Sequence, residues 1–142
     1  MTSLGTAQYQ RLLEFRTGLR RFLRWSERQA RLAGLTPAQH QLLLAVQGHS
    51  LDRGPTIGEV ARSLTLRHNS AVGLVDRAEG AGLVRRVPDP ADHRIVRLRL
   101  TRLGSRRLER LSALHLAELG RMAPTLRDLW ADLPETRVAR PS

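Results

Sequence analysis

The polar residues with the most evident chemistry stand at the expected start of a helix, in the run Arg67-His68-Asn69-Ser70. Apolar residues follow at three- and four-residue spacing up to residue 78, so that face should pack inward and leave the polar run exposed. A helix N-terminus offers backbone N–H groups to phosphate oxygens, and in a major groove Asn69 can pair with adenine and Arg67 with guanine. These side chains would suit contact with a nucleic acid, and the alternative is a solvated helix face. The residues expected to face outward are Arg67, His68, Asn69, Ser70, Gly73 and Arg77.

The charge of the chain favours an anionic partner. Among 142 residues, 24 are basic and 13 acidic, which gives a net charge of +11, and every basic residue is arginine. Residues 53–110 hold thirteen arginines against six acidic residues, whereas residues 111–142 hold four of each. An excess of this size suits nucleic acid first and a membrane surface or an acidic protein second, the plain alternative being a protein that is merely basic. The neutral C-terminal third should have another role.

Composition excludes several kinds of site. The chain has no cysteine, which excludes disulfides, thiolate metal sites and thiol nucleophiles. No two of its five histidines have the close helical spacing of metal ligands, so we expect no metal site even if folding gathers His40, His49 and His115. The sequence contains no nucleophile elbow, phosphate-binding loop or glycine-rich dinucleotide loop. We therefore expect no enzyme activity and no cofactor.

The N-terminal segment predicts one long helix over residues 7–33. Its apolar residues recur at three- and four-residue spacing, and Arg20, Arg24 and Arg28 share another face. Gly34 should end the helix. The segment is rich in arginine and has no long apolar run, so we expect neither a signal peptide nor a membrane span, and a cytoplasmic protein.

Two capping boxes mark the helices that follow. Residues 36–39, Thr-Pro-Ala-Gln, open a helix over residues 37–47, and residues 56–59, Thr-Ile-Gly-Glu, open a second, short helix. After a connection of three residues comes the helix that begins near Arg67 and ends near Gly80. Two short helices joined by a tight turn are the helix-turn-helix arrangement.

The periodicity then changes to that of strands. Residues 83–87 and 95–100 are candidate strands, and the loop between them has two prolines and a charged tip. In the second strand, apolar residues alternate with Arg97 and Arg99, which share a face and which we expect to be solvated or to neutralise a phosphate backbone, and not to read sequence. A helix-turn-helix followed by a hairpin with a basic loop is a winged helix.

Helical periodicity returns at Thr101. We expect Pro124 to interrupt it, because proline removes a backbone hydrogen bond and crowds the preceding turn. A last helix should then run to about Leu133, and the residues after Pro134 should form a frayed tail.

Three segments resemble the MarR family, the multiple antibiotic resistance regulators. They are LTPAQHQLLLAV, GEVARSLTLRHNSAVGLVDRAEGAGLVRR and PDPADHRIVRLRLTRLG. Within them, the GLV-x-R end of the recognition helix, Asp-x-Arg at Asp92 and Arg94, and a Leu-Thr-x-x-Gly helix start occur in the family's order. The resemblance covers about residues 7–133.

The resemblance implies a mainly α fold with a small β-hairpin wing, in which a winged helix-turn-helix carries a dimerisation arm. Residues 1–34 would form the N-terminal dimerisation helix, 35–100 the DNA-binding domain, and 101–142 the C-terminal dimerisation helices and tail. The two winged helices of a homodimer would bind double-stranded DNA at a pseudo-palindromic operator. The function implied is a sequence-specific transcription regulator, a ligand-responsive repressor. The alternatives are a sequence-indifferent architectural DNA-binding protein and a basic protein-interaction module.

The resemblance also places residues of the wing on DNA. Arg94 would enter the minor groove, whose narrow form attracts arginine, with Asp92 as its orienting partner. His93 would contact phosphate or simply be exposed. Of Arg85 and Arg86 only one should meet the DNA backbone, since neighbours in a strand face opposite ways. The DNA-binding candidates outside the recognition helix are Thr56, Arg86, Asp92, His93 and Arg94.

Two positions depart from the family's pattern. Arg67 stands where relatives usually carry a helix-capping Ser or Thr, which leaves the start of the helix open and makes Thr65 an alternative cap. Gly73 stands where many relatives carry a larger polar side chain, so base readout at that position would be absent.

Many relatives sense a small molecule, often an aromatic anion, in a cleft between the arm and the winged helix. An arginine of the first helix could pair with a carboxylate there. The competing interpretation is plain core, because an apolar helix stripe usually packs inward. A small aromatic or anionic effector is therefore expected only if the stripe is not core. The residues that could line the cleft are Phe15, Leu19, Phe22, Trp25, His40 and Leu44.

Overall fold

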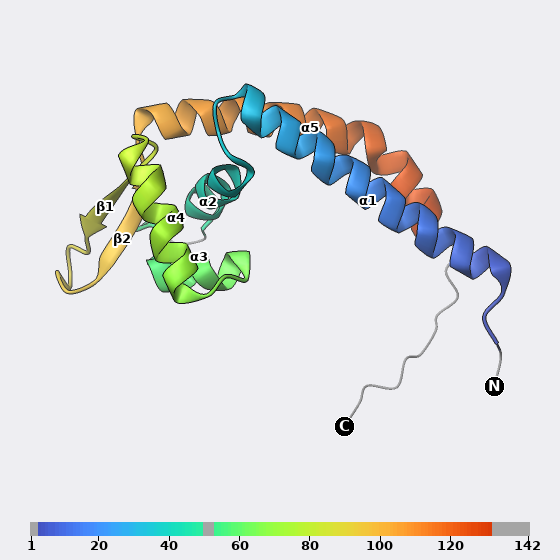
Figure 1. Ribbon diagram of the computed structural model, residues 1–142, viewed down its shortest axis with the longest axis horizontal. Helices are drawn as coiled ribbons and strands as arrows, with labels where there is room; N and C mark the ends of the chain where they lie inside the picture. Colours follow the sequence, from blue (N-terminus) through green and yellow to red (C-terminus); the bar gives the residue numbers. More distant parts are fainter. Residues whose placement is uncertain (1–2, 50–52, 132–142) are drawn as a thin grey trace.

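The computed structural model describes residues 3–49 and 53–131, which form five helices and one two-stranded antiparallel sheet. In Figure 1, α1 (Thr6–Leu32) and α5 (Arg102–Ala131) lie side by side as an elongated arm. The other elements gather at the end of the arm where α5 begins. They are α2 (Pro37–Gln47), α3 (Ile57–Leu64), α4 (His68–Gly80), β1 (Val84–Pro88) and β2 (Val96–Leu100). The predicted mainly α fold with a β-hairpin wing is confirmed.

The two predicted capping boxes begin α2 and α3. The hydroxyl oxygen of Thr36 accepts a hydrogen bond from the N–H of Gln39 (3.1 Å), and the Gln39 side chain accepts one from the N–H of Thr36 (3.0 Å). Thr56 and Glu59 make the same reciprocal pair at α3. Each box satisfies two N–H groups that a helix start otherwise leaves without a partner, so short-range sequence is enough to start these helices.

The core lies where α2, α4, the hairpin and the first half of α5 meet. Leu42 and Leu43 of α2, Leu83 and Leu98 of the hairpin, and Leu111 of α5 are all fully buried. The apolar face predicted for α4 is buried as well, and its residues are Ala71, Leu74, Val75 and Ala78. The outer face of α4 is thereby turned to solvent.

The arm leaves a large apolar surface uncovered in the single chain. Only Ser26 and Ala30 of α1 are buried. The core interpretation of the apolar stripe is therefore wrong for Leu19, which is 45% exposed, and for Leu44 of α2, which is 47% exposed. Contiguous exposed leucines of this kind mark an interaction surface. They are Leu12, Leu13, Leu19 and Leu23 on α1, and Leu114, Leu116 and Leu119 on α5.

The expected break at Pro124 is wrong. α5 continues through this proline as one helix to Ala131. Met122 and Leu126, on either side of Pro124, line one cavity together with residues of α1. The helix thus tolerates the one backbone hydrogen bond that proline removes. The predicted end near Leu133 and the tail after it lie outside the described residues.

A tight junction joins the hairpin to α5. The hydroxyl of Thr101 donates to the carbonyl oxygen of Gly82 (2.6 Å), and its oxygen accepts from the N–H of Gly104 (3.1 Å). A β-carbon at Gly104 would lie 2.1 Å from the carbonyl oxygen of Leu83, so only glycine allows this approach. The Leu-Thr-x-x-Gly sequence therefore sets the position of the wing relative to the arm.

Candidate nucleic-acid interface

The turn between α3 and α4 ends one helix and exposes the start of the next. Thr65 has a left-handed backbone (φ 55°), and the N–H of Leu66 donates to the carbonyl oxygen of Ala61 (2.8 Å), which closes α3. Thr65 thus ends α3, so the alternative that it caps α4 is wrong. Arg67 is the N-cap of α4, and its side chain makes no capping hydrogen bond. The N–H groups of the first turn of α4 are therefore left for an outside acceptor.

The polar face of α4 is exposed over more than two turns. Gly73 lies within this face, and a β-carbon there would be 3.2 Å from Nη1 of Arg77. The Arg77 guanidinium therefore lies over the space that a larger side chain at position 73 would occupy. The Arg77 guanidinium therefore supplies hydrogen-bond donors at the position where Gly73 has no side chain. The exposed members of the face are Arg67, His68, Asn69, Ser70 and Arg77.

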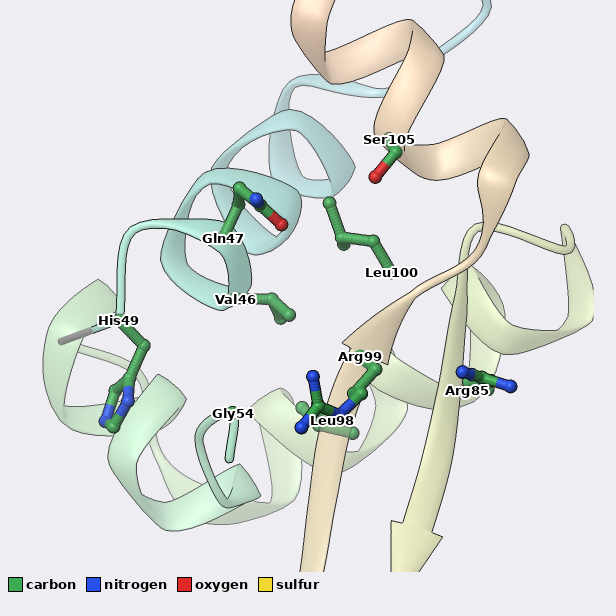
Figure 2. A pocket seen from close by; sticks show the side chains of 9 residues that line it. All are labelled: Val46, Gln47, His49, Gly54, Arg85, Leu98, Arg99, Leu100 and Ser105. Atoms are coloured by element: carbon green, nitrogen blue, oxygen red, sulfur yellow. The ribbon is translucent and has the colours of Figure 1, made fainter. Parts of the chain in front are cut away.

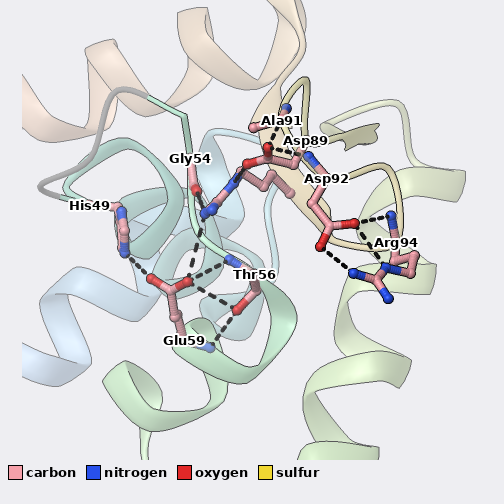
Figure 3. A network of polar contacts seen from close by, with 9 residues as sticks. His49, Gly54, Thr56, Glu59, Asp89, Ala91, Asp92 and Arg94 are labelled. Atoms are coloured by element: carbon pink, nitrogen blue, oxygen red, sulfur yellow. Dashed lines mark hydrogen bonds and ion pairs between the residues drawn. The ribbon is translucent and has the colours of Figure 1, made fainter.

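Asp89, which was not predicted, organises the loop between β1 and β2 (Figure 3). Its side chain is 2% exposed, and Oδ1 accepts hydrogen bonds from the N–H groups of Ala91 (2.8 Å) and Asp92 (3.1 Å). Its Oδ2 accepts one from Nε of Arg97 (2.5 Å). Arg97 and these backbone donors lower the pKa of Asp89 to about 2. An aspartate that binds N–H groups two and three residues later is a turn signal that the sequence did contain.

Arg97 is not solvated, contrary to the prediction. Its side chain is 13% exposed, and Nη1 donates to the carbonyl oxygen of Gly54 (3.0 Å) and lies 3.8 Å from Oε1 of Glu59. Glu59 also contacts His49, which follows α2. Arg97 thus joins Asp89 of the wing to Gly54 and Glu59 at the start of α3, three partners that Figure 3 labels. Strand alternation identifies residues that share a face, but it does not reveal that another segment covers that face.

Arg94 projects from the wing loop and is held by Asp92. Nε and Nη2 of Arg94 lie 3.1 Å from Oδ1 and Oδ2 of Asp92, a two-pronged pair that lowers the pKa of the Asp92 carboxyl (Figure 3). The Arg94 side chain is nevertheless 91% exposed. Asp92 therefore orients an exposed guanidinium, as expected. His93 beside them is exposed, and the contact of all three with DNA stays a prediction.

Two of the predicted phosphate contacts already have partners inside the protein. The Thr56 hydroxyl accepts from the N–H of Glu59 (3.2 Å) and donates to its carboxylate (3.2 Å). Arg86 binds Asp76 (2.6 Å) and Glu79 (2.7 Å), so its guanidinium ties β1 to α4. A direct role of either side chain on DNA stays a prediction. What the structure adds is that Arg86 holds the wing against the candidate recognition helix.

Arg85 points away from Arg86, as strand geometry requires. It lines a polar cavity of about 360 Å³ between the end of α2, the hairpin and the start of α5. Figure 2 shows Arg85 around this cavity with its cross-strand partner Arg99, together with Gln47 and Ser105. Of the two neighbouring arginines, one thus lies beside α4 and the other at a separate cavity.

Three of the predicted effector residues line one cavity of about 470 Å³ between α1, α2 and α5. Phe22, His40 and Leu44 belong to it. Phe15 lines a different cavity, of about 500 Å³, between α1 and the last turns of α5. Neither cavity is lined by Leu19 or Trp25. The other lining residues of the first cavity are Leu23, Ser26, Gln41, Ser112, His115, Leu116 and Leu119.

Two histidines give the first cavity its polar character. Nδ1 of His115 lies 2.7 Å from the carbonyl oxygen of Leu111, and Nε2 lies 2.6 Å from the hydroxyl of Ser26. Because a carbonyl oxygen only accepts, Nδ1 of His115 donates to Leu111. His40 is 4% exposed, and its ring centre lies 4.8 Å from that of His115 with the two rings tilted by 52°. Burial, with His115 nearby, lowers the pKa of His40, so a neutral ring faces the cavity.

The described residues hold no grouping of three or more His, Cys, Asp or Glu side chains that could bind a metal ion. His40 and His115 meet, but His49 contacts Glu59 instead. In the same part of the chain, no helix combines the length and the apolar character needed to cross a bilayer.

Comparison with known proteins identifies the family. Residues 33–95, which include the helix-turn-helix and most of the wing, match the model of the MarR family. YsmB of Bacillus subtilis, described as an uncharacterized HTH-type transcriptional regulator, is 31% identical over 84 residues. That match covers 59% of this chain and 53% of YsmB, so the chain spans about half the length of this relative.

Two solved structures share the fold over most of the chain. CouR from Rhodococcus jostii, bound to p-coumaroyl-CoA, is 26% identical with a TM-score of 0.65, over 88% of this chain and 93% of CouR. The MepR–DNA complex of S. aureus is 19% identical with a TM-score of 0.61, over 85% of this chain and 81% of MepR. These matches identify residues 33–95 as a winged helix of the MarR family, and the same fold extends over most of the chain.

Proposed function

We propose that this protein is a transcription regulator that binds double-stranded DNA in a sequence-specific manner. The observation that carries the proposal is the exposed start of α4, whose polar side chains and N–H groups stand beside a wing that presents Arg94. Asn69 and Arg67 would read base edges in the major groove, with Arg77 further along the helix. Arg94 would enter the minor groove. Binding, and no catalytic step, accounts for these residues.

We propose that the active species is a homodimer joined through the arm. The support is the set of exposed leucines on α1 and α5, which a single chain does not cover. Residues 1–34 and 101–142 would form the arm, and residues 35–100 the DNA-binding domain. A two-fold dimer presents two copies of α4, which favours a pseudo-palindromic operator with half-sites one helical turn apart.

We propose further that a small aromatic or anionic molecule regulates the repressor through the cavity between the arm and α2. The cavity has aromatic and aliphatic walls with His40, His115 and Ser26 as polar groups, which suits such a ligand. CouR, 26% identical, is known in complex with p-coumaroyl-CoA. A ligand that binds better when the two winged helices are wrongly spaced would lower the affinity for the operator.

The first experiment is selection of the purified protein on a random duplex library at near-physiological salt, followed by sequencing of the bound DNA. Recovery of a pseudo-palindrome with half-sites one turn apart is the expected result. Retention without a consensus would favour the sequence-indifferent architectural alternative, which the net charge of +11 also supports. A protein retained by no duplex would contradict DNA binding and favour the protein-interaction alternative.

A further inference from the structure

One row of arginines on α1 takes no part in the interface described above. We call Arg20, Arg24, Arg28 and Arg31 the arginine ridge. All four side chains are exposed, and their spacing of three and four residues places them on one face of the helix. The segment from Arg20 to Arg31 contains five arginines and one glutamate.

The arginine ridge carries uncompensated charge. Within the described part of the chain, none of its four guanidinium groups makes an ion pair or a side-chain hydrogen bond. Like charges four residues apart destabilise a helix. On α5, by contrast, Arg121 is paired with Glu118. The ridge therefore has the exposed, unpaired positive charge that binding of an external anion requires.

The ridge lies on the side of α1 that the arm does not use. With about 100° of rotation per residue, Arg24 lies roughly 160° around the helix from the buried Ser26. The exposed Leu19 and Leu23 lie on the flank between these two faces. A dimer formed through the leucines would therefore leave the ridge open to solvent.

We propose that the arginine ridge is a second DNA-binding surface, which holds the phosphate backbone of another duplex while α4 and the wing bind the first. From Arg20 to Arg31 the helix rises by roughly 16 Å, which matches about five base pairs of duplex. Guanidinium groups bind phosphate oxygens in two-pronged fashion without reading sequence. The protein would thus bridge two DNA segments.

The composition of this face favours DNA over other anionic partners. From residue 20 to residue 31, the exposed positions hold arginine, Glu27 and Leu23, and Leu23 belongs to the leucine surface that the proposed dimer would cover. Protein interfaces place aromatic and apolar anchors at their centre, and membrane-surface helices need an apolar face beside the basic one. A purely electrostatic surface fits the uniform charge of a phosphate backbone.

A bridging assay tests the proposal with the full chain. One duplex is tethered to beads, a fluorescent duplex of unrelated sequence is added, and protein retention and captured fluorescence are measured separately. Retention on the tethered duplex reports α4 and the wing, whereas capture of the second duplex reports the ridge. The variant carries Arg20→Gln, Arg24→Gln, Arg28→Gln and Arg31→Gln, and the matched control carries Arg20→Lys, Arg24→Lys, Arg28→Lys and Arg31→Lys.

We expect the parent and the lysine control to capture the second duplex and the glutamine variant to lose capture at least about tenfold while staying on the tethered duplex. With four phosphate contacts, capture by the parent should fall roughly a hundredfold between about 50 and 200 mM salt. The glutamine variant should melt at or above the temperature of the parent, because a repulsive row has been removed. Loss of capture therefore would not reflect unfolding.

Equal capture by the glutamine variant and the parent would overturn the proposal, since the bridge would then come from other residues. A parent that stays on the tethered duplex but captures labelled polyglutamate in place of DNA would overturn it in favour of an acidic protein partner. A parent that is retained by no duplex would overturn both the bridging proposal and the proposed recognition face.

Discussion

Replacing Gly104 with alanine tests the junction that positions the wing on the arm. The new β-carbon would lie 2.1 Å from the carbonyl oxygen of Leu83 and 3.1 Å from its carbonyl carbon, whereas ordinary contact begins at 3.4 Å. Both atoms are backbone, so relief requires α5 to move from β1 by about 1 Å, with a cost for overpacking of about 1–3 kcal/mol. The movement also weakens the hydrogen bonds of Thr101, at about 1 kcal/mol each. Alanine has a higher helix propensity than glycine, which offsets up to about 1 kcal/mol of this cost. The net loss in the free energy of unfolding is therefore near 2 kcal/mol.

Thermal and urea unfolding at equal protein concentration measure this loss, because a dimer melts at a concentration-dependent temperature. For a chain of this size we expect Gly104→Ala to lower Tm by roughly 8 °C. Gly80→Ala is the matched control, since Gly80 is exposed at the end of α4 with no atom within 4 Å of an added β-carbon. It should leave Tm unchanged or raise it. A Gly104→Ala protein that melts with the parent would refute the reasoning about this junction.

Three further predictions concern the wing, the recognition face and the cavity. Asn69→Ala should relax preference at one base pair per half-site, a change of about 1–3 kcal/mol there, whereas Arg94→Ala should weaken all sequences and lower the salt slope by about 0.9 per protomer. Competition with base-substituted operators separates the two, and identical profiles would contradict the site map. Arg97→Met leaves Asp89 with backbone donors alone, so amide hydrogen exchange in the wing loop should accelerate, and unchanged protection would show that the brace is dispensable. Burial lowers the pKa of His40 from 6.5, so the folded state binds fewer protons than the unfolded state and stability falls as pH drops below about 6.5. His40→Leu should flatten this part of the Tm–pH curve, and a curve parallel to that of the parent would contradict it.

Most elements of the fold were predictable because their signals are local. The capping boxes at Thr36 and Thr56, the spacing of apolar residues in α4 and the alternation in β2 each involve residues within one or two turns of one another. The exposure of Asn69 and the pairing of Asp92 with Arg94 follow from the same short-range patterns. Their function on DNA rests on the family and on chemistry, and the assays above test it.

Most of the mistaken predictions concern segments that are distant in sequence but meet in space. Pro124 has a strong local tendency to end a helix, but α5, which lies beside α1, continues through it. Arg97 has the alternation of a solvated strand residue, but the loop at Gly54, 43 residues earlier, and Asp89 enclose it. Thr65 has the side chain of a helix cap, but its backbone is needed to end α3.

By itself the sequence determined the order and type of the elements, the polar face of α4 and the charge that favours a nucleic acid. Hydrophobic periodicity and capping are properties of short segments, and net charge is a property of composition. Only the tertiary structure decided that Arg86 and Arg97 brace the wing, that His40 and His115 share a cavity, and that the arginine ridge faces away from the arm. Each of these depends on which segments meet in space. Burial and ion pairing between segments that are distant in sequence depend on how the whole chain packs, and local sequence does not encode them.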